Sequence, residues 1–468
     1  MRLDDASPDP FWLDRPSPEQ AGPLEGPVEA GLAIVGAGFT GLWAAVMAKE
    51  ERPEREVVLL EAATAGWGAS GRNGGFIDAS LTHGLPNGAA RFASELDALE
   101  ALGRANLDGL KADLARHRID AAWEDSGMLS VATRPHELSG LEEEAALLRR
   151  YGWDADVLDR DAVRAQVASP TYLGAVWQRT GVALADPGAL ALGLRRAAPA
   201  LGVRLYERTP VVSAKANGDR ARAPVRGAVS LRTPAGLVRA GRVLLATGAY
   251  PPLARSIRRL VAPVYDYVIV TEPLTAAQRR AIGWAGGQGI ADRGNRFHYY
   301  RLTPDGRILF GGYEAVYRYG NRVDDARLSR HTPTHRLLAQ HLLETFPALE
   351  GIAVTHAWGG PIDTCSRFCV TFGRALGGRA VYAVGYTGLG VAASRFGART
   401  ALDLLDGVEN ERTRLKLVRT RPLPFPPEPA RWAVIQATRR AMARADEGGG
   451  RDGPWLRLLN RLGLGFDS

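Results

Sequence analysis

The stretch LAIVGAGFTGLWAAVMAKEE, residues 32–51, together with VVLLE, residues 57–61, decides the fold. An apolar run that ends in glycine predicts a buried strand, and the apolar stretch after it predicts a helix. Gly36, Gly38 and Gly41 form GxGxxG between the two, and VVLLE predicts a second strand. Strand, glycine turn, helix and strand make a βαβ unit, which indicates an α/β fold with a parallel sheet.

This unit predicts a dinucleotide site. The first glycine permits the tight turn, the second lets the backbone approach a pyrophosphate, and the third lets helix and strand pack closely. Glu61 stands about 20 residues after Gly41, where an acidic side chain accepts hydrogen bonds from ribose hydroxyls. The pattern therefore predicts an ADP-containing cofactor, and the charge of Glu61 disfavours the 2′-phosphate of NADP.

The sequence after the second strand separates FAD from NAD. An NAD enzyme normally continues with alternating strands and helices, whereas GWGASGRNGGF follows here at residues 66–76. Strands that end in glycine turns return only at RVLLATGAY (242–250) and AVYAVGYTG (380–388). Distant segments that converge on one long cofactor favour FAD.

Composition is that of a globular protein, with 46% hydrophobic and 24% charged residues among 468. The net charge is +8, but the 59 basic residues are spread along the chain beside 51 acidic ones. A solvated, arginine-rich surface explains this distribution better than nucleic-acid binding, which needs a clustered basic face.

Cys365 and Cys369 are the two cysteines, which excludes a disulfide framework, gives no metal-binding pattern and suggests a reducing cytoplasm. Residues 31–48 reach the length of a membrane helix, but four glycines interrupt them. We therefore expect no transmembrane segment.

The chain resembles the FAD-dependent amine and amino-acid oxidoreductases of the D-amino-acid-oxidase superfamily, and within it the γ-glutamylputrescine oxidase-like branch. The resemblance covers roughly residues 30–408. It rests on the motifs IVGAGFTGLWAA, VVLLEA, GWGASGRNGG, RVLLATGAY, HYYRLTPDGRILFGG, HAWGGPID and VGYTGLGVAAS.

The resemblance implies a mixed α/β fold with two domains. A Rossmann-like FAD-binding domain is assembled from discontinuous segments, and a β-sheet-rich substrate domain roofs the flavin. We expect an N-terminal arm laid on the surface (1–28) and a C-terminal Pro-rich segment with a helix (409–468). The FAD-binding domain is expected at 29–95, 165–262 and 353–408, and the substrate domain at 96–164 and 263–352.

The resemblance also implies cofactor contacts. Gly36, Gly38, Thr40 and Gly41 would hold the pyrophosphate, Glu61 the adenosine ribose, and Val211 or Val212 the adenine. Thr247 and Gly248 would lie near the flavin chain. The pyrophosphate and flavin would be lined by Ala69, Ser70, Arg72, Asn73, Gly74 and Gly75, and the pyrimidine end of the ring by Gly385, Tyr386, Thr387, Gly388, Leu389 and Gly390.

The implied reaction is hydride transfer from a carbon next to an amine nitrogen to flavin N5, followed by hydrolysis of the imine. The substrate would be a small amine or amino acid, and the candidate catalytic residues are Tyr265, His298, Tyr300 and Arg301. Alternation puts His298 and Tyr300 on one strand face and Tyr299 and Arg301 on the other, and either face could line the pocket.

Two alternatives stay open. Related sarcosine oxidases use a lysine near N5 to help oxygen react, but no lysine falls between residues 216 and 415, so a dehydrogenase with another electron acceptor is an alternative to an oxidase. A flavoprotein without turnover is a second alternative. Covalent attachment of the flavin through the sulfur of Cys365 is a further alternative. We expect instead that Cys365 is a buried thiol and that FAD is bound non-covalently.

Overall fold

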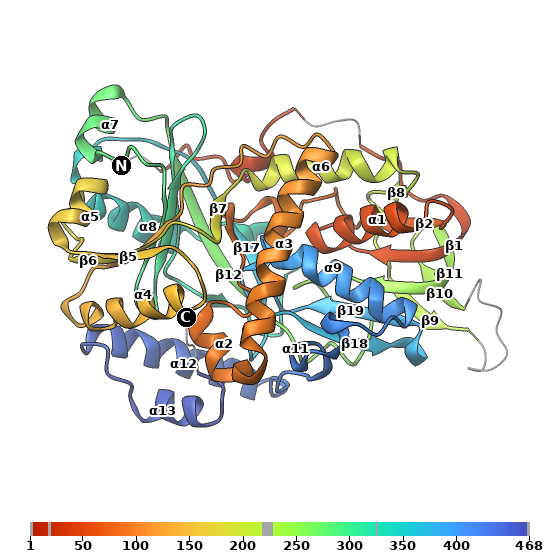
Figure 1. Ribbon diagram of the computed structural model, residues 1–468. Helices are drawn as coiled ribbons and strands as arrows, with labels where there is room; N and C mark the ends of the chain where they lie inside the picture. The colour runs from red at the N-terminus through yellow and green to blue at the C-terminus, as the bar shows by residue number, and fades with distance from the viewer. Residues whose placement is uncertain (1–2, 17–19, 218–227, 324–325, 466–468) are drawn as a thin grey trace.

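The computed structural model describes residues 3–16, 20–217, 228–323 and 326–465. Two large sheets lie side by side, the first on the right of Figure 1 and the second on the left. The first has eight strands and the second nine, while β3 (Phe76–Asp78) and β7 (Val182–Leu184) form a separate pair. The expected mixed α/β architecture is confirmed.

The first sheet contains the βαβ unit. Its order is β18 (Thr371–Ala375), β19 (Ala380–Val384), β11 (Gly236–Leu245), β1 (Gly26–Val35), β2 (Val57–Leu60) and β8 (Arg204–Tyr206), with β10 (Val229–Arg232) paired to β11 and β9 (Ser213–Ala216) to β10. β1 is parallel to both β2 and β11, and β11 is parallel to β19. The carboxyl ends of four strands therefore meet at one edge.

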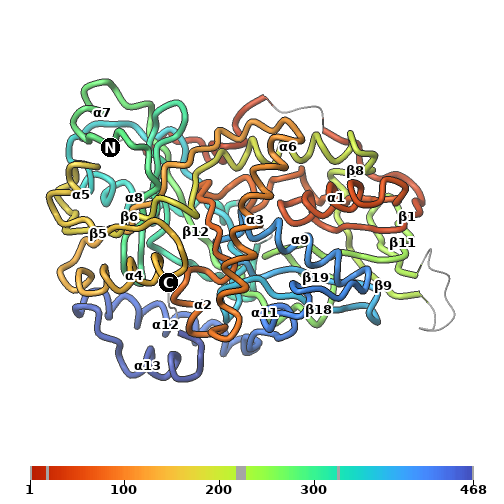
Figure 2. The backbone as a smooth tube through the Cα atoms, viewed as in Figure 1, coloured from red at the N-terminus to blue at the C-terminus, as the bar shows by residue number. Residues whose placement is uncertain are grey.

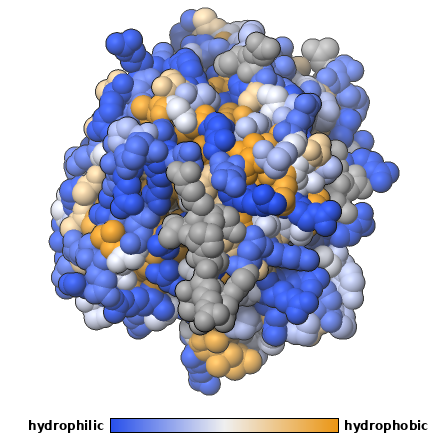
Figure 3. Space-filling model, turned by 90° about the vertical axis from the view of Figure 1, so that its right-hand side faces the viewer, coloured by the Kyte–Doolittle hydropathy of each residue, from blue (hydrophilic) through white to orange (hydrophobic). Residues whose placement is uncertain are grey.

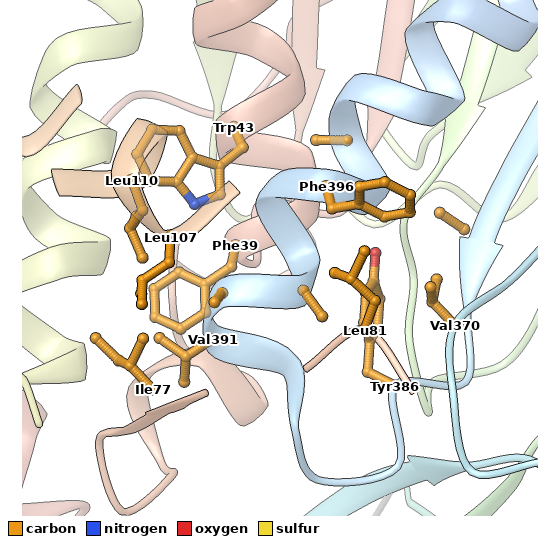
Figure 4. Packing of buried hydrophobic residues seen from close by; sticks show 14 of the residues in the cluster. Phe39, Trp43, Ile77, Leu81, Leu107, Leu110, Val370, Tyr386, Val391 and Phe396 are labelled. Carbon is orange, nitrogen blue, oxygen red and sulfur yellow. The ribbon is translucent and has the colours of Figure 1, made fainter. Parts of the chain in front are cut away.

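Helices bury one face of this sheet. Residues 39–48 of α1 (Phe39–Glu51) are all buried, because α3 (Leu96–Arg116), α6 (Pro187–Ala200) and α9 (Gly390–Asp406) surround them. Figure 4 shows side chains of α1, α3, α9 and β3 meeting in this core. Asp186 caps α6, since its side chain accepts a hydrogen bond from the Ala189 N–H at 2.8 Å.

The second sheet is built from later segments. Its order is β16 (Val316–Tyr317), β12 (Ala262–Thr271), β15 (Ile308–Gly312), β14 (His298–Leu302), β13 (Gly289–Asp292), β4 (Met128–Ala132), β6 (Gly174–Gln178) and β5 (Ala155–Leu158), with β17 (Val354–Thr364) paired to β12. The surrounding helices are α4 (Leu141–Arg150), α5 (Arg160–Gln166), α7 (Ala276–Ile282) and α8 (Thr332–Thr345). α8 packs on the face turned away from the first sheet.

Three expected domain boundaries need correction. β6 was expected in the FAD-binding domain but pairs with β4 of the second sheet. β17 was expected there too, but it runs antiparallel along β12. α3 was expected in the substrate domain but packs on α9, where Asn106 Nδ2 donates to the Ala392 carbonyl at 2.9 Å. Long-range pairing decided each case, and sequence order does not reveal it.

Most described residues of the N-terminal arm are exposed or half-buried, but the arm is anchored in the interior at Trp12. Its short 3₁₀ turn, η1 (Phe11–Leu13), inserts Trp12, which is 0% exposed. Ser7 pairs with β17, donating to the Thr355 carbonyl (2.8 Å) and accepting from the Ala357 N–H (2.9 Å). Apolar surface on Trp12 explains the insertion.

The C-terminal segment runs along the lower side of the molecule (Figure 2). It contains α10 (Glu411–Arg414), α11 (Lys416–Arg419), α12 (Ala430–Glu447) and α13 (Pro454–Arg461). α2 (Leu85–Phe92) lies next to it, and Arg91 donates to the Gly465 carbonyl at 2.6 Å. Within the described part of the chain, none of the helices is long and apolar enough to cross a membrane.

Candidate active site

The glycine turn after β1 is as tight as the sequence predicts. Gly36 has φ +100°, and a Cβ there would lie 2.5 Å from the Ala246 carbonyl oxygen. A Cβ on Gly41 would lie 1.8 Å from the Gly36 carbonyl oxygen. Only glycine fits either place, so α1 starts directly against the strand ends. A helix N-terminus in this position favours a bound anion.

Glu61 lies at the end of β2, beside that turn. Its carboxylate accepts from the N–H groups of Ala37 (2.7 Å) and Ala63 (2.9 Å). Burial raises its pKa, while these backbone hydrogen bonds lower it. The carboxylate therefore stands where the βαβ pattern requires an acceptor for ribose hydroxyls.

Loop 66–76 lies across the start of α1. Ser70 Oγ accepts from the Phe39 N–H at 2.8 Å. Arg72 is buried, and it donates through Nε to the Trp67 carbonyl (2.9 Å) and through Nη1 to the Gly359 carbonyl (3.0 Å). Its guanidinium lies 4.5 Å from the Trp67 ring centroid, and burial lowers its pKa. Arg72 therefore joins this loop to β17.

Asn73 folds the loop on itself. Its Nδ2 donates to the carbonyls of Ala69 (3.0 Å) and Ser70 (2.9 Å), and its Oδ1 accepts from the Gly75 N–H (2.8 Å). A Cβ on Gly74 would lie 2.7 Å from the Tyr299 ring, and one on Gly75 would lie 2.1 Å from the Ala185 carbonyl oxygen. These glycines are therefore required by protein neighbours as well as by any cofactor.

The glycine turn after β19, residues 385–390, lies at the same edge of the first sheet as the turn after β1. Thr40 Oγ1 donates to Tyr386 OH at 2.8 Å, which places turn 385–390 beside the start of α1. Gly385 has φ +86° and donates from N–H to Asp363 Oδ2 at 2.7 Å. Thr387 and Gly388 follow with positive φ, and Leu389 and Gly390 begin α9. Burial raises the pKa of Asp363 to about 6.

Sequence reasoning did not single out Asp363, although it ends the motif HAWGGPID. An acid that closes a strand just before a glycine turn was the available signal. The structure shows its function in the fold, which is to hold the N–H groups of turn 385–390.

These residues fit FAD. Thr247 Oγ1 is buried without a hydrogen-bond partner among the described residues, at the strand edge shared with Gly36 and Glu61. Gly248 has φ +52°. Val212, expected at the adenine, is 63% exposed. Figure 3 shows the end of the molecule formed by the first sheet, where hydrophobic residues lie among hydrophilic ones. An unsatisfied hydroxyl, a glycine cradle and an acid suit a dinucleotide.

β14 shows which of its faces meets this edge. Tyr299 and Arg301 face loop 66–76, since the Tyr299 ring abuts Gly74 and Arg301 Nη1 donates to the Ala185 carbonyl (2.6 Å) and the Gly75 carbonyl (3.4 Å). Arg301 is fully buried, and burial lowers its pKa to about 10. It therefore links two backbone segments.

His298 and Tyr300 point to the opposite face, toward α8. His298 contacts His341 of α8 (Nε2 to Nδ1, 2.9 Å) and Asp292. Tyr300 OH donates to Asp292 Oδ1 at 3.1 Å. Tyr265 stacks on Tyr267 in the same core. The structure therefore does not bring His298 and Tyr300 together with Arg301, whereas Tyr265 is close enough to Arg72 of loop 66–76 to interact with its charge. The catalytic roles of all four residues stay predictions.

A carboxylate that sequence reasoning missed lies on the inward face. Tyr299 OH donates to Asp266 Oδ2 at 2.5 Å, and Asp266 Oδ1 accepts from the Tyr267 N–H at 2.9 Å. Both side chains are half-buried, and burial raises the pKa of Asp266 to about 6. Asp266 and Tyr265 are neighbours on β12, so the choice between them depended on strand orientation, which the sequence left open.

Cys365 lies under turn 385–390. Its thiol donates to the carbonyls of Cys369 (3.1 Å) and Gly385 (3.3 Å). Burial raises the pKa of both thiols, which disfavours the reactive thiolate. This environment supports the expectation of a structural thiol.

A strand–glycine turn–helix unit with an acid after the next strand, facing a second sheet across the same loops, defines a dinucleotide-binding protein. The sequence profile of the FAD dependent oxidoreductase family (DAO) matches residues 32–404. The chain belongs to this family, whose members are FAD-dependent oxidoreductases that act on amines or amino acids, and the resemblance inferred from the motifs is confirmed.

Named relatives agree. The chain is 32% identical to γ-glutamylputrescine oxidoreductase of Escherichia coli over 381 residues, covering 80% of this chain and 83% of the relative. It is 30% identical to a probable oxidoreductase OrdL of Rhizobium meliloti over 427 residues, covering 85% and 91%. Glycine oxidase of Geobacillus kaustophilus superposes with a TM-score of 0.66 at 20% identity, covering 84% and 99%, which shows the shared fold.

Proposed function

We propose that this protein oxidises the C–N bond of a small amine or amino acid to an imine, which water then hydrolyses. FAD, when bound, supplies the hydride acceptor. The observation that carries the proposal is the Asp266–Tyr299 pair, on the face of the second sheet that abuts the glycine loop.

The pair suits the proton chemistry of amine oxidation. A protonated amine holds its nitrogen lone pair in an N–H bond, so the neutral amine is the form that loses hydride. Asp266 has its pKa raised to about 6, so it is ionised at neutral pH and is a stronger base than an ordinary aspartate, which favours it as the acceptor of the substrate ammonium proton. Tyr299 donates to Oδ2 and holds the carboxylate in one orientation.

Arg301 would then serve the site indirectly. Its donation to the Gly75 and Ala185 carbonyls keeps loop 66–76 against the second sheet. We therefore assign proton acceptance to Asp266 and loop placement to Arg301. Loop placement matters because an error of about 1 Å at a reacting centre can lower a rate a hundredfold.

For the substrate we propose an amine that carries a second polar or charged group, as a γ-glutamylated polyamine does. This choice rests on the E. coli relative, which is named for γ-glutamylputrescine. For the compartment we propose the cytoplasm, because both cysteines are free and buried.

The test is an anaerobic panel of amines and amino acids, including γ-glutamylated diamines, scored by bleaching of flavin absorbance. Bleaching by at least one amine supports the proposal, whereas a flavin that no member reduces favours a non-catalytic flavoprotein. Admitting air afterwards separates the electron acceptors, because slow reoxidation indicates a dehydrogenase.

A further inference from the structure

Two buried indole N–H groups donate hydrogen bonds to consecutive backbone carbonyls of loop 66–76. Trp12 Nε1 donates to the Asn73 carbonyl, and Trp358 Nε1 donates to the Arg72 carbonyl, both at 2.9 Å. Each indole is 0% exposed. Trp358 comes from β17, but Trp12 comes from the N-terminal arm, outside the 32–404 region that matches the family profile.

These hydrogen bonds fix more than the carbonyls. In a trans peptide the C=O of one residue and the N–H of the next point in opposite directions. The N–H groups of Asn73 and Gly74 therefore point away from the two indoles. Within residues 3–16, 20–217, 228–323 and 326–465, neither N–H donates a hydrogen bond.

Gly74 is itself buried, and buried N–H groups are nearly always paired in proteins. Two successive donors without a partner among the described residues, at the centre of the glycine loop, indicate an acceptor that this part of the protein does not supply.

The arm is anchored on both sides of Trp12. The Phe11 ring meets the His356 ring edge-on with centroids 5.3 Å apart, and His356 Nε2 lies 3.0 Å from Asp14 Oδ2. Arg15 pairs with Asp186 at 2.6 Å. A Cβ on Gly71 would lie 2.8 Å from Leu13, so the arm also touches the loop directly.

We propose that Trp12 and Trp358 are positioning residues for FAD, which orient the Asn73 and Gly74 N–H groups so that they donate to a cofactor oxygen. The N-terminal arm is then part of the flavin site. The proposal rests on loop 66–76 contacting FAD and does not depend on which amine is oxidised.

The test uses apoprotein of the full chain titrated with FAD, followed by flavin fluorescence and the visible absorption spectrum. Trp12→Phe and Trp358→Phe keep an aromatic ring and remove the N–H donor. Each is expected to weaken FAD binding about tenfold, the effect of losing one buried hydrogen bond, and to shift the flavin absorption bands.

Trp284→Phe is the matched control, because the Trp284 indole is buried and donates to the Gln288 carbonyl (3.1 Å) away from the loop. It should lower the melting temperature of the apoprotein and leave FAD affinity and spectrum unchanged. The proposal is overturned if the two test variants behave like this control. If one test variant does not fold, the other decides. Because no amine is added, this result is separate from that of the substrate panel.

Discussion

The replacement Asp266→Asn should change stability and activity in opposite directions. Burial raises the pKa of Asp266 from 3.8 to about 6 in the folded protein. Between these values the folded state binds more protons than the unfolded state, so the free energy of unfolding falls as pH rises. Two pKa units correspond to roughly 3 kcal/mol, which is an upper bound for a half-buried group.

The asparagine variant does not ionise, so it should be more stable than the wild type at pH 8, by about 1–3 kcal/mol. The advantage should shrink through pH 6 and disappear near pH 4. Urea unfolding of the apoprotein at pH 4.5, 6 and 8 measures the free energy of unfolding of both proteins. Other buried acids titrate equally in both, so their contribution cancels when one free energy is subtracted from the other.

The same variant should lose the pH dependence of flavin reduction. In the wild type the rate with a given amine should rise as Asp266 ionises near pH 6, and in the variant that rise should be absent and the rate at pH 8 lower by about 10²–10⁴-fold. Stopped-flow bleaching at a series of pH values measures both.

Asp78→Asn is the control, because burial raises the pKa of Asp78 to about 6 as well, while its described hydrogen bond comes from the Ser80 N–H at 2.8 Å. It should gain stability and keep the pH dependence of the rate. Wild-type pH dependence in Asp266→Asn, or lower stability at pH 8, would refute the reasoning.

Three other predictions test the cofactor cradle and the assignment of strand faces. Glu61→Gln should weaken FAD binding about tenfold, because the amide has one acceptor oxygen where the carboxylate has two; equilibrium titration with FAD measures this, and unchanged affinity would contradict the ribose assignment. Gly41→Ala should lower stability by about 3 kcal/mol or more, because its Cβ meets the Gly36 carbonyl, whereas Gly22→Ala, with no atom within 4 Å, should leave the melting temperature unchanged. His298→Gln should alter thermal stability but change the rate of flavin reduction less than twofold, while Tyr299→Phe should slow flavin reduction at least tenfold. The reverse order would indicate that the catalytic residues lie on the face of β14 that packs against α8.

Local signals in the sequence were sufficient for much of the fold. The βαβ unit and the strands β11, β14 and β19 lie where the patterns predict them. Glycine spacing, caps and turns depend on residues a few positions apart, so a single sequence carries them. The convergence of the distant glycine turns on one flavin was predicted from the family resemblance, and the flavin contacts of those turns stay predictions.

The remainder depended on contacts between distant residues. Alternation showed that Tyr299 and Tyr300 face opposite ways, but only the packing of α8 and loop 66–76 decides which face is inward. Asp266 was missed for this reason, and Trp12 was missed because a Pro-rich, acidic segment does not reveal a partner more than sixty residues away. The link that Arg301 makes could not be read from the sequence, because its carbonyl partners come from Gly75 and Ala185.

The pairing of Ser7 with Thr355 and Ala357 has a consequence for biosynthesis. A ribosome makes the arm first and β17 some 350 residues later, at about 5–20 residues per second. For tens of seconds Trp12 therefore lacks the β17 residues it packs against, and β1 lacks β11, its pairing partner, which in turn pairs with β19. The cradle can close only when almost the whole polypeptide has emerged. FAD therefore binds only near the end of synthesis or after it, and fragments truncated before β17 should accumulate without flavin.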